Sequence, residues 1–289
     1  MTGVVFLNKP QDITSFAAGN RLRRQLGAKK AGHTGTLDPM ATGVLVVMLG
    51  GATRFIEFLP SHDKAYRATV KLGVTTDTLD MQGEVLTRTE SRTTAKEFEK
   101  AMLGFVGEIE QVPPMYSALK KDGKKLYELA RQGIEVERES RRITVYSLKM
   151  THADEQAQEF GFEVKCSSGT YVRSLAADMG EALGCGAALS ALCRTEAHGV
   201  KLEQCKSLEN ITEKDIASIE ALLPYPIVTV SEAQAKRFCN GGSLDAGRIH
   251  TKIAIGLNKV YSPDGRFLGL GSLAENSGEL TIKRLYIDT

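Results

Sequence analysis

Residues 66–72 read Tyr-Arg-Ala-Thr-Val-Lys-Leu, and the side chains at every second position of this run are hydrophobic or aromatic. A period of two is typical of a β-strand that buries one face and exposes the other. A second run, residues 160–166, alternates Phe, Phe, Val and Cys with Gly, Glu and Lys. The two runs predict half-buried strands, each with one face against a core.

Three other runs carry apolar residues at helical spacing. In the first, Ser15 is the candidate N-cap and Phe16 lies on the apolar side. The second begins with Thr94 and Glu97, which have the spacing of a capping box. The third follows Tyr171. Each run predicts a helix of a few turns.

The order of these elements predicts the fold class. Residues 44–49 form a continuous apolar run that fits either a strand or the first turns of a buried helix. Strands and helices are interleaved, and several strands look like antiparallel hairpins. This favours a mixed α/β fold over a doubly wound parallel sheet. The pattern breaks at Pro224 and Pro226, and a Ser-Pro-Asp-Gly turn at residues 262–265 then lies between short strand-like runs, which predicts a small β-barrel or sandwich.

Composition excludes several classes of protein. The chain has 289 residues, 42% hydrophobic and 25% charged, which is typical of a globular protein with one large and one small domain. Five cysteines without a C-x-x-C pair indicate neither a disulfide framework nor a zinc site. No apolar stretch reaches the roughly 20 residues that a spanning helix needs, and no signal peptide is evident. We therefore expect a cytoplasmic protein that does not enter a membrane.

The net charge of +2 is too small to indicate a polyanion-binding protein by itself. Basic residues nevertheless gather in three segments, residues 21–30, 120–131 and 138–142. Each segment could be an ordinary solvated surface or part of a nucleic-acid interface.

One segment places a carboxylate among small residues. Residues 32–43 read Gly-His-Thr-Gly-Thr-Leu-Asp-Pro-Met-Ala-Thr-Gly. Glycines remove the Cβ atoms that would keep a flat ligand away from the backbone. Asp38 could act there as a nucleophile or general base. The alternative is an Asp-Pro turn in which the side chain caps its own backbone.

This segment closely resembles the catalytic motif of the TruB-type family, the bacterial tRNA pseudouridine-55 synthases. Further matching motifs follow in order over about residues 3–225. They are Leu7-Asn8-Lys9-Pro10, Lys64-Ala65-Tyr66-Arg67, Thr76-Asp77-Thr78-Leu79-Asp80 with Gly83, Gln111-Val112-Pro113-Pro114-Met115-Tyr116-Ser117-Ala118 and Cys166-Ser167-Ser168-Gly169-Thr170-Tyr171-Val172-Arg173.

The resemblance implies a fold and a domain division. It implies a mixed, mostly antiparallel sheet of the pseudouridine synthase type, flanked by helices, in residues 1–227. Residues 228–289 look like a small, β-barrel-like RNA-binding domain of the PUA type, and the residues that carry this resemblance are Phe238, Gly241 and Gly242.

The resemblance also implies the reaction. Asp38 matches the catalytic nucleophile, and uridine 55 in the T loop of transfer RNA is flipped into the pocket, where its uracil detaches from C1′, rotates and rejoins through C5. No cofactor or metal is expected. The expected partner is the T arm of transfer RNA, and we expect a monomer without an obligate protein partner.

Five further residues match the family's pocket. Tyr66 would stack on the flipped base, and Leu192 would pack against it. Arg173 would pair with the catalytic carboxylate, because a guanidinium binds carboxylate bidentately. Tyr171 would contact the nucleotide, and His33 would occupy the space that the flipped uridine leaves. Without the resemblance, Tyr66 and Leu192 would be interpreted as core residues, and Arg173 and His33 as surface residues.

Three more residues belong to matching motifs with less defined roles. Lys9 and Lys64 are expected to reach phosphate, and Asp80 is expected either to support the pocket from behind or to contact RNA.

Two other functions stay open. The chain could be a non-catalytic RNA-binding or tRNA-folding factor in which Asp38 is structural. Both functions predict RNA binding, so the product distinguishes them: in an enzyme, Asp38→Asn should retain binding and lose modification. A glycoside hydrolase would need a second carboxylate at a set distance, and only Asp80 and Asp178 are candidates.

Overall fold

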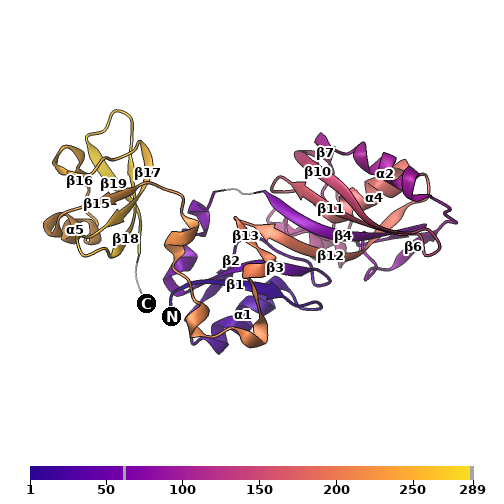
Figure 1. The fold of residues 1–289 in the computed structure, drawn as a ribbon, viewed down its shortest axis with the longest axis horizontal. Coiled ribbons are helices and arrows are strands. Elements are labelled where there is room, and N and C mark those ends of the chain that lie inside the picture. The colour runs from indigo at the N-terminus through magenta and orange to yellow at the C-terminus, as the bar shows by residue number, and fades with distance from the viewer. Residues whose placement is uncertain (61–62, 287–289) are drawn as a thin grey trace.

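The computed structural model describes residues 1–60 and 63–286. Within these residues, ten strands form one large sheet (Figure 1). The main path of this sheet runs, in spatial order, through β14 (Lys206–Ser207), β1 (Gly3–Lys9), β3 (Thr42–Leu49), β12 (Ala187–Ala197), β4 (Lys64–Leu72), β11 (Glu159–Cys166), β10 (Arg141–Asp154) and β7 (Gly107–Gln111). Two short strands, β2 (Ala31–His33) and β13 (Val200–Lys201), pair with β3 and β12.

The pairing of this sheet is mostly antiparallel. Among the described strand pairs of this large sheet, only β1–β14 and β3–β12 run parallel. The mixed α/β fold predicted from the sequence is therefore confirmed. None of the helices in the described part of the chain is long and apolar enough to cross a bilayer.

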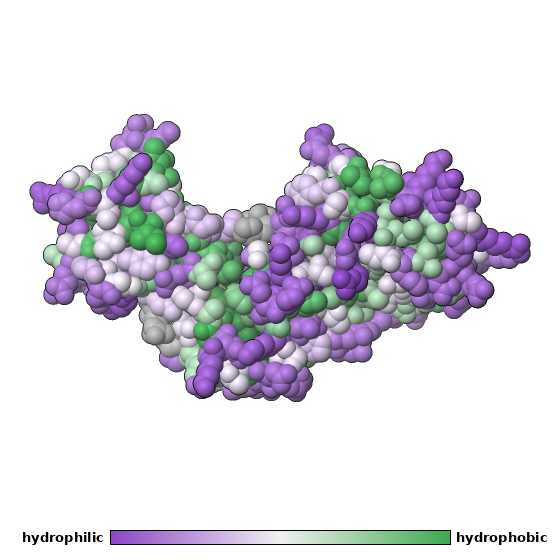
Figure 2. Space-filling model, in the orientation of Figure 1, coloured by the Kyte–Doolittle hydropathy of each residue, from purple (hydrophilic) through white to green (hydrophobic). Residues whose placement is uncertain are grey.

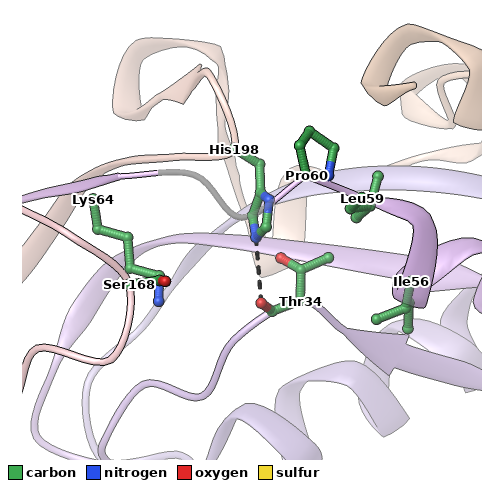
Figure 3. Close-up of a pocket in the computed structure, with 7 residues that line it drawn as sticks. All are labelled: Thr34, Ile56, Leu59, Pro60, Lys64, Ser168 and His198. Atoms are coloured by element: carbon green, nitrogen blue, oxygen red, sulfur yellow. Dashed lines mark hydrogen bonds between the residues drawn. The ribbon is translucent and has the colours of Figure 1, made fainter. Parts of the chain in front are cut away.

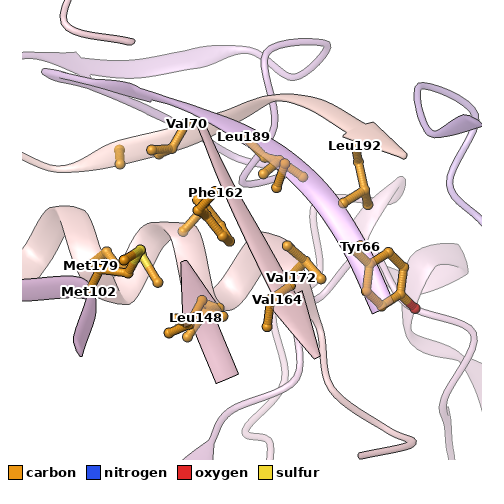
Figure 4. Packing of buried hydrophobic residues seen from close by; sticks show 14 of the residues in the cluster. Tyr66, Val70, Met102, Leu148, Phe162, Val164, Val172, Met179, Leu189 and Leu192 are labelled. Atoms are coloured by element: carbon orange, nitrogen blue, oxygen red, sulfur yellow. The ribbon is translucent and has the colours of Figure 1, made fainter. Parts of the chain in front are cut away.

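The largest core lies against β4 and β11, the two strands that the alternation predicts. They pair side by side, with Val70 opposite Phe160, and bury their apolar faces together. Two helices, α2 (Ala95–Leu103) and α4 (Val172–Ala182), contribute to the same core. Phe98 of α2 stacks on Phe160 with 4.6 Å between ring centroids. Figure 4 shows part of this core, with Tyr66 and Leu192 at one end.

The neighbouring part of the sheet is buried on both faces. Val44 and Val46 of β3 contact one core, whereas Leu45 and Val47 contact another with helix α1 (Ser15–Gln25). A strand covered on both sides needs apolar residues at every position. This explains why residues 44–49 lack alternation and resemble a buried helix in the sequence.

A smaller sheet forms the C-terminal end of the chain. Its strands are, in spatial order, β15 (Ile227–Thr229), β17 (Gly256–Tyr261), β18 (Phe267–Leu273), β19 (Glu279–Leu285) and β16 (Leu244–Asp245). Helix α5 (Glu232–Cys239) packs on this sheet through Phe238, which is fully buried.

Specific contacts hold the small sheet against the large one. Tyr261 donates a hydrogen bond to Glu220, and Arg284 pairs with Glu57. Phe55 of the 3₁₀ segment η1 (Gly50–Phe58) packs on Phe267 with 5.8 Å between ring centroids. Figure 2 shows that the molecule is hollowed between the C-terminal sheet and the end of the large sheet that carries β7 and β10, and that hydrophilic side chains cover much of both rims.

Several short elements connect these parts. They are the hairpins β5 (Val74–Thr76) with β6 (Val85–Arg88) and β8 (Lys120–Lys121) with β9 (Lys124–Lys125), helix α3 (Leu126–Ala130), and the 3₁₀ segments η2 (Leu202–Gln204), η3 (Leu208–Asn210), η4 (Glu213–Asp215), η5 (Ile219–Leu222) and η6 (Ala246–Arg248).

Candidate active site

The glycine-rich segment forms a loop at the centre of the large sheet. It leaves β2 at His33 and enters β3 at Thr42, where β3 pairs in parallel with β12. Gly43 has a φ of +102°, and a Cβ on it would lie 2.2 Å from the backbone oxygen of Arg194. Only glycine therefore fits where the loop joins the sheet.

Two buried side chains, those of Ser15 and Lys9, hold the backbone of the loop by hydrogen bonds. The Ser15 hydroxyl accepts a hydrogen bond from the Leu37 amide at 2.8 Å and donates one to the Leu37 carbonyl at 3.0 Å. The Lys9 ammonium donates to three carbonyls, those of Pro10 at 2.8 Å, Ile13 at 2.7 Å and Pro39 at 3.2 Å. Asp38 thus lies between two anchored residues, Leu37 and Pro39.

Asp38 reaches the surface, and Arg173 lies beneath it. Nε of Arg173 is 2.8 Å from Oδ2 of Asp38, and Nη2 is 3.0 Å from Oδ1, so the pair is bidentate. The Arg173 side chain is 4% exposed, whereas that of Asp38 is 32% exposed. Bidentate, charge-assisted bonds fix a carboxylate in orientation as well as in charge. Asp38 is therefore held in one position while part of it faces solvent.

The rest of the Arg173 guanidinium is also occupied. Nη1 donates to the Thr78 carbonyl at 2.6 Å, and Nη2 donates to the Tyr116 carbonyl at 2.8 Å. Asp80 lies behind it, with Oδ2 3.8 Å from Nη1. Burial raises the pKa of Asp80, against the opposing effects of its hydrogen bond from Thr78 and of the Arg173 charge. Of the two roles expected for Asp80, this buried position fits support from behind.

Tyr66 and Leu192 come from the adjacent strands β4 and β12. In the register of these strands, Tyr66 lies opposite Arg194 and Leu192 lies opposite Ala68. Both side chains belong to the same packed cluster as Leu37 of the loop. Burial raises the pKa of Tyr66, so its hydroxyl stays protonated at neutral pH. The loop thus lies beside an aromatic and an aliphatic side chain.

Tyr171 and His33 complete the residues predicted from the sequence. Tyr171 is the N-cap of α4, and its backbone is held by Gln111, which donates to the Tyr171 carbonyl at 3.1 Å and accepts from its amide at 2.8 Å. Burial, followed by the Arg194 charge, lowers the pKa of His33, which favours the neutral imidazole. Its buried Nδ1 has no hydrogen-bond partner among the described residues.

The position of Lys9 corrects one prediction. Lys9 is fully buried, and its ammonium is occupied by backbone carbonyls, so it does not lie where a phosphate could reach it. Burial lowers the pKa of Lys9 to about 8, although Asp38 and Asp12 oppose this. Lys9 therefore anchors the backbone of the catalytic loop and of the segment before α1, and does not form part of the RNA-facing surface.

Two residues of the site were missed by sequence reasoning. Arg194 is 1% exposed and donates to the carbonyls of Val44 at 2.8 Å, Gly35 at 3.1 Å and Thr36 at 3.4 Å. Gln111, at 2% exposure, was seen only as part of a motif. Both bind backbone atoms far away in the sequence. The signal available for Arg194 was a long polar side chain after a mostly apolar run in β12, and the polar strand β7 offers no such signal for Gln111.

A cavity of about 230 Å³ lies beside the loop (Figure 3). Nε2 of His198 donates a hydrogen bond at 3.3 Å to the carbonyl of Thr34, which also lines the cavity. Burial and then the Arg194 charge lower the pKa of Lys64. The lining residues are Thr34, Ile56, Leu59, Pro60, Lys64, Ser168 and His198. In the described part of the chain, no three His, Cys, Asp or Glu side chains gather where they could hold a metal ion.

Comparisons with known proteins agree with this geometry. Residues 23–172 match the TruB family pseudouridylate synthase N-terminal domain, and residues 226–286 match the C-terminal domain of pseudouridine synthase II TruB. The tRNA pseudouridine synthase B of Aromatoleum aromaticum is 44% identical, over 98% of this chain and 92% of that protein. The protein of the same name from Clostridium perfringens strain 13 is 44% identical, over 97% of this chain and 98% of that protein.

Solved structures show the same fold. A chain of a Cbf5–Nop10–Gar1 complex superposes with a TM-score of 0.71 at 26% identity, over 99% of this chain and 85% of that chain. A chain of an H/ACA RNP bound to a substrate RNA superposes with a TM-score of 0.69 at 24% identity, over 99% and 85%. With the two family matches and relatives at 44% identity over nearly the whole length, the chain belongs to the TruB family of pseudouridylate synthases.

Proposed function

We propose that this chain is a tRNA pseudouridine synthase that isomerises uridine 55 in the T loop of transfer RNA, with Asp38 as the catalytic nucleophile. The carboxylate of Asp38 carries this proposal, because it is anchored by a buried arginine and still partly exposed. Its relatives named tRNA pseudouridine synthase B support the substrate.

The reaction needs little more than a positioned carboxylate. The bond between C1′ and N1 breaks, the uracil rotates, and a bond forms between C1′ and C5. The proton lost from C5 is balanced by one gained at N1, so the product is an isomer. Breaking a glycosidic bond creates positive character at the sugar carbon, which Asp38 stabilises or captures. Arg173 holds the carboxylate in a fixed orientation through its two hydrogen bonds.

The residues around Asp38 receive the flipped nucleoside. Tyr66 stacks on the base, Leu192 packs against its edge, and Tyr171 contacts the nucleotide. His33 fills the space that the base leaves in the RNA, and a neutral ring can stack there without the desolvation penalty of a charge. Flipping a base requires a few kcal/mol, which stacking and phosphate contacts must offset.

The surface around the site suits an RNA partner. Lys64 lies beside Gly35 of the catalytic loop and lines the neighbouring cavity, and the basic hairpin β8–β9 exposes Lys120, Lys121 and Lys124. Lys29 and Lys30 are exposed after α1. Such clusters neutralise phosphates and make binding dependent on salt.

We also propose a domain division, a cellular location and a partner for the whole protein. Residues 1–227 form the catalytic domain, and residues 228–289 form the small RNA-binding domain of the PUA type. The protein acts in the cytoplasm as a monomer on the T arm of transfer RNA, without an obligate protein partner. The hollow between the two sheets in Figure 2 offers space for such an RNA.

The test is chemical. Unmodified transfer RNA labelled with tritium at C5 of uridine is incubated with the protein, and the product is mapped by carbodiimide labelling. Release of one tritium per RNA, with a carbodiimide adduct at position 55 only, is the expected result. The matched control is the same RNA with cytidine at position 55. Binding without tritium release would show an RNA-binding factor instead.

A further inference from the structure

Behind the Arg173–Asp38 pair, hydrogen bonds close a ring whose role the reaction does not explain. Arg173 donates from Nη1 to the Thr78 carbonyl at 2.6 Å and from Nη2 to the Tyr116 carbonyl at 2.8 Å. The Tyr116 hydroxyl donates to Oδ2 of Asp77 at 3.0 Å. Because Asp77 and Thr78 are consecutive, the guanidinium, Tyr116 and the peptide between Asp77 and Thr78 form one closed circuit.

The Asp77 carboxylate is fixed from its other side as well. Its Oδ1 accepts a hydrogen bond from the Glu84 amide at 2.7 Å. A Cβ on Gly83 would lie 2.3 Å from this oxygen and 2.2 Å from Oγ1 of Thr78, so only glycine leaves room for the carboxylate. Both oxygens of Asp77 therefore have defined partners, and the side chain that meets Tyr116 cannot move freely.

The circuit shares an atom with the catalytic pair. Nη2 of Arg173 donates both to the Tyr116 carbonyl at 2.8 Å and to Oδ1 of Asp38 at 3.0 Å. The guanidinium is planar, so a shift of the Tyr116 carbonyl rotates the fork that holds Asp38. The hydrogen bond to Asp77 raises the pKa of Tyr116, which keeps its hydroxyl a donor at neutral pH.

Tyr116 also directly precedes the segment that carries the basic hairpin β8–β9 and helix α3. The next residue, Ser117, accepts a hydrogen bond at its carbonyl from the Tyr127 amide at 3.2 Å, and Leu119 accepts one from Leu126 at 2.8 Å. These bonds join Tyr116 to the hairpin β8–β9 and α3. The hydrogen bond from the Tyr116 hydroxyl to Asp77 ties the start of this segment to the strand hairpin that follows β4.

We propose that the Tyr116–Asp77 hydrogen bond is a latch that positions Arg173 for catalysis, which rests on the proposed role of Asp38. Tyr116 and Asp77 touch neither the nucleoside nor its reacting atoms. They act through Arg173, by holding the Tyr116 carbonyl against Nη2 and the Thr78 carbonyl against Nη1. Their effect should therefore be seen in the rate of the chemical step and not in the affinity for RNA.

The experiment removes the hydroxyl alone. Under single-turnover conditions, Tyr116→Phe should lower the rate of tritium release about tenfold, with the dissociation constant for transfer RNA unchanged. Asp77→Asn keeps an acceptor for the Glu84 amide and should lower the rate by a similar factor. The double variant should be no slower than either single variant, since both break the same bond.

A matched control separates positioning from stability. Tyr261 also donates to a carboxylate, that of Glu220, but at the junction of the two sheets. Tyr261→Phe should keep the wild-type rate on bound RNA. The latch is overturned if Tyr116→Phe reacts at the wild-type rate, changes only the affinity, or combines multiplicatively with Asp77→Asn. A wild-type protein that releases no tritium would instead refute the proposed function, before any variant is made.

Discussion

Two buried arginines, Arg173 and Arg194, bind the catalytic loop in different ways. Arg173 binds the Asp38 carboxylate bidentately and has a second carboxylate, Asp80, 3.8 Å away. Arg194 binds three carbonyls of the loop and its exit strand, and no carboxylate of the described residues lies within 4.0 Å of its guanidinium. Both side chains are almost fully buried.

The two arginines therefore have different roles, one in the reaction and one in the conformation of the loop. Arg173 orients the reacting group, whereas Arg194 fixes the path of the backbone that carries it. The charge of Arg194 also lowers the pKa values of His33 and Lys64, so it acts as a positive source beside the loop. That charge suits a partner that brings its own anions, as RNA does. Variants of the two arginines should therefore fail in different measurements.

The largest effect is expected for Arg173→Met. This change keeps much of the side-chain volume but removes both donors to Asp38 and leaves Asp80 without a cation. The rate of tritium release should fall about a thousandfold, while the affinity for transfer RNA changes little. Arg173→Lys keeps the positive charge but loses the two parallel donors of the guanidinium. Its rate of tritium release should therefore lie between those of the wild type and Arg173→Met. A methionine variant within tenfold of the wild-type rate would show that Arg173 does not position the carboxylate.

A smaller effect of another kind is expected for Arg194→Met. Three carbonyls, those of Gly35, Thr36 and Val44, lose their donor, and the contact to Val44 is fully buried. The free energy of unfolding in urea should fall by about 3 kcal/mol, and the rate should fall less than in Arg173→Met when both are measured as folded proteins. The distinction between the arginines would be wrong if Arg173→Met and Arg194→Met lost the same factor in rate, or if Arg194→Met had the same free energy of unfolding as the wild type.

The smallest effect is expected at Asp178, which shares helix α4 with Arg173 but is not paired with a cation in the described structure. Burial, and then the charge of Glu181, raises the pKa of Asp178 to about 6. The folded protein therefore binds a proton more tightly than the unfolded chain does, and its stability falls as the pH rises from about 4 to about 6.

Removing the Asp178 carboxylate should change the free energy of unfolding, whereas removing the Asp38 carboxylate should change the rate of the reaction. Asp178→Asn should raise the free energy of unfolding by about 1 kcal/mol at pH 8, after allowance for solvent screening of a partly exposed group. At pH 4.5 the gain should be much smaller, because Asp178 is then protonated in the folded protein. Urea titrations at the two pH values measure this. The same gain at both values would mean that the charge of Asp178 is not the cause.

The elements with a clear period were predictable from the sequence. Strands β4 and β11 alternate because one face is buried, and the capping box of Thr94 and Glu97 is present at the start of α2. The start of α1 was predicted one residue late. Its N-cap is Thr14, because the hydroxyl of Ser15 is occupied by Leu37 of the catalytic loop. Phe16, predicted on the apolar side of this helix, is 74% exposed.

The site was predictable only in part, because its partners are far apart in the sequence. The resemblance to a family brought together Asp38, Tyr66 and Arg173, which the structure places around one loop. It did not show that Lys9 is buried, or that Arg194 binds carbonyls about 150 residues earlier. A hydrogen bond to a backbone oxygen leaves no pattern of residue types, so such anchors appear only in the structure.

The most direct test of the central claim is the Asp38→Asn variant, which replaces one carboxylate oxygen with an amide and preserves the shape of the side chain. Its affinity for transfer RNA and its single-turnover rate of tritium release should be measured on the same preparation. We predict wild-type affinity within about threefold and a rate at least about a thousandfold lower. Pseudouridine formation at more than about a tenth of the wild-type rate would show that the reaction does not depend on Asp38.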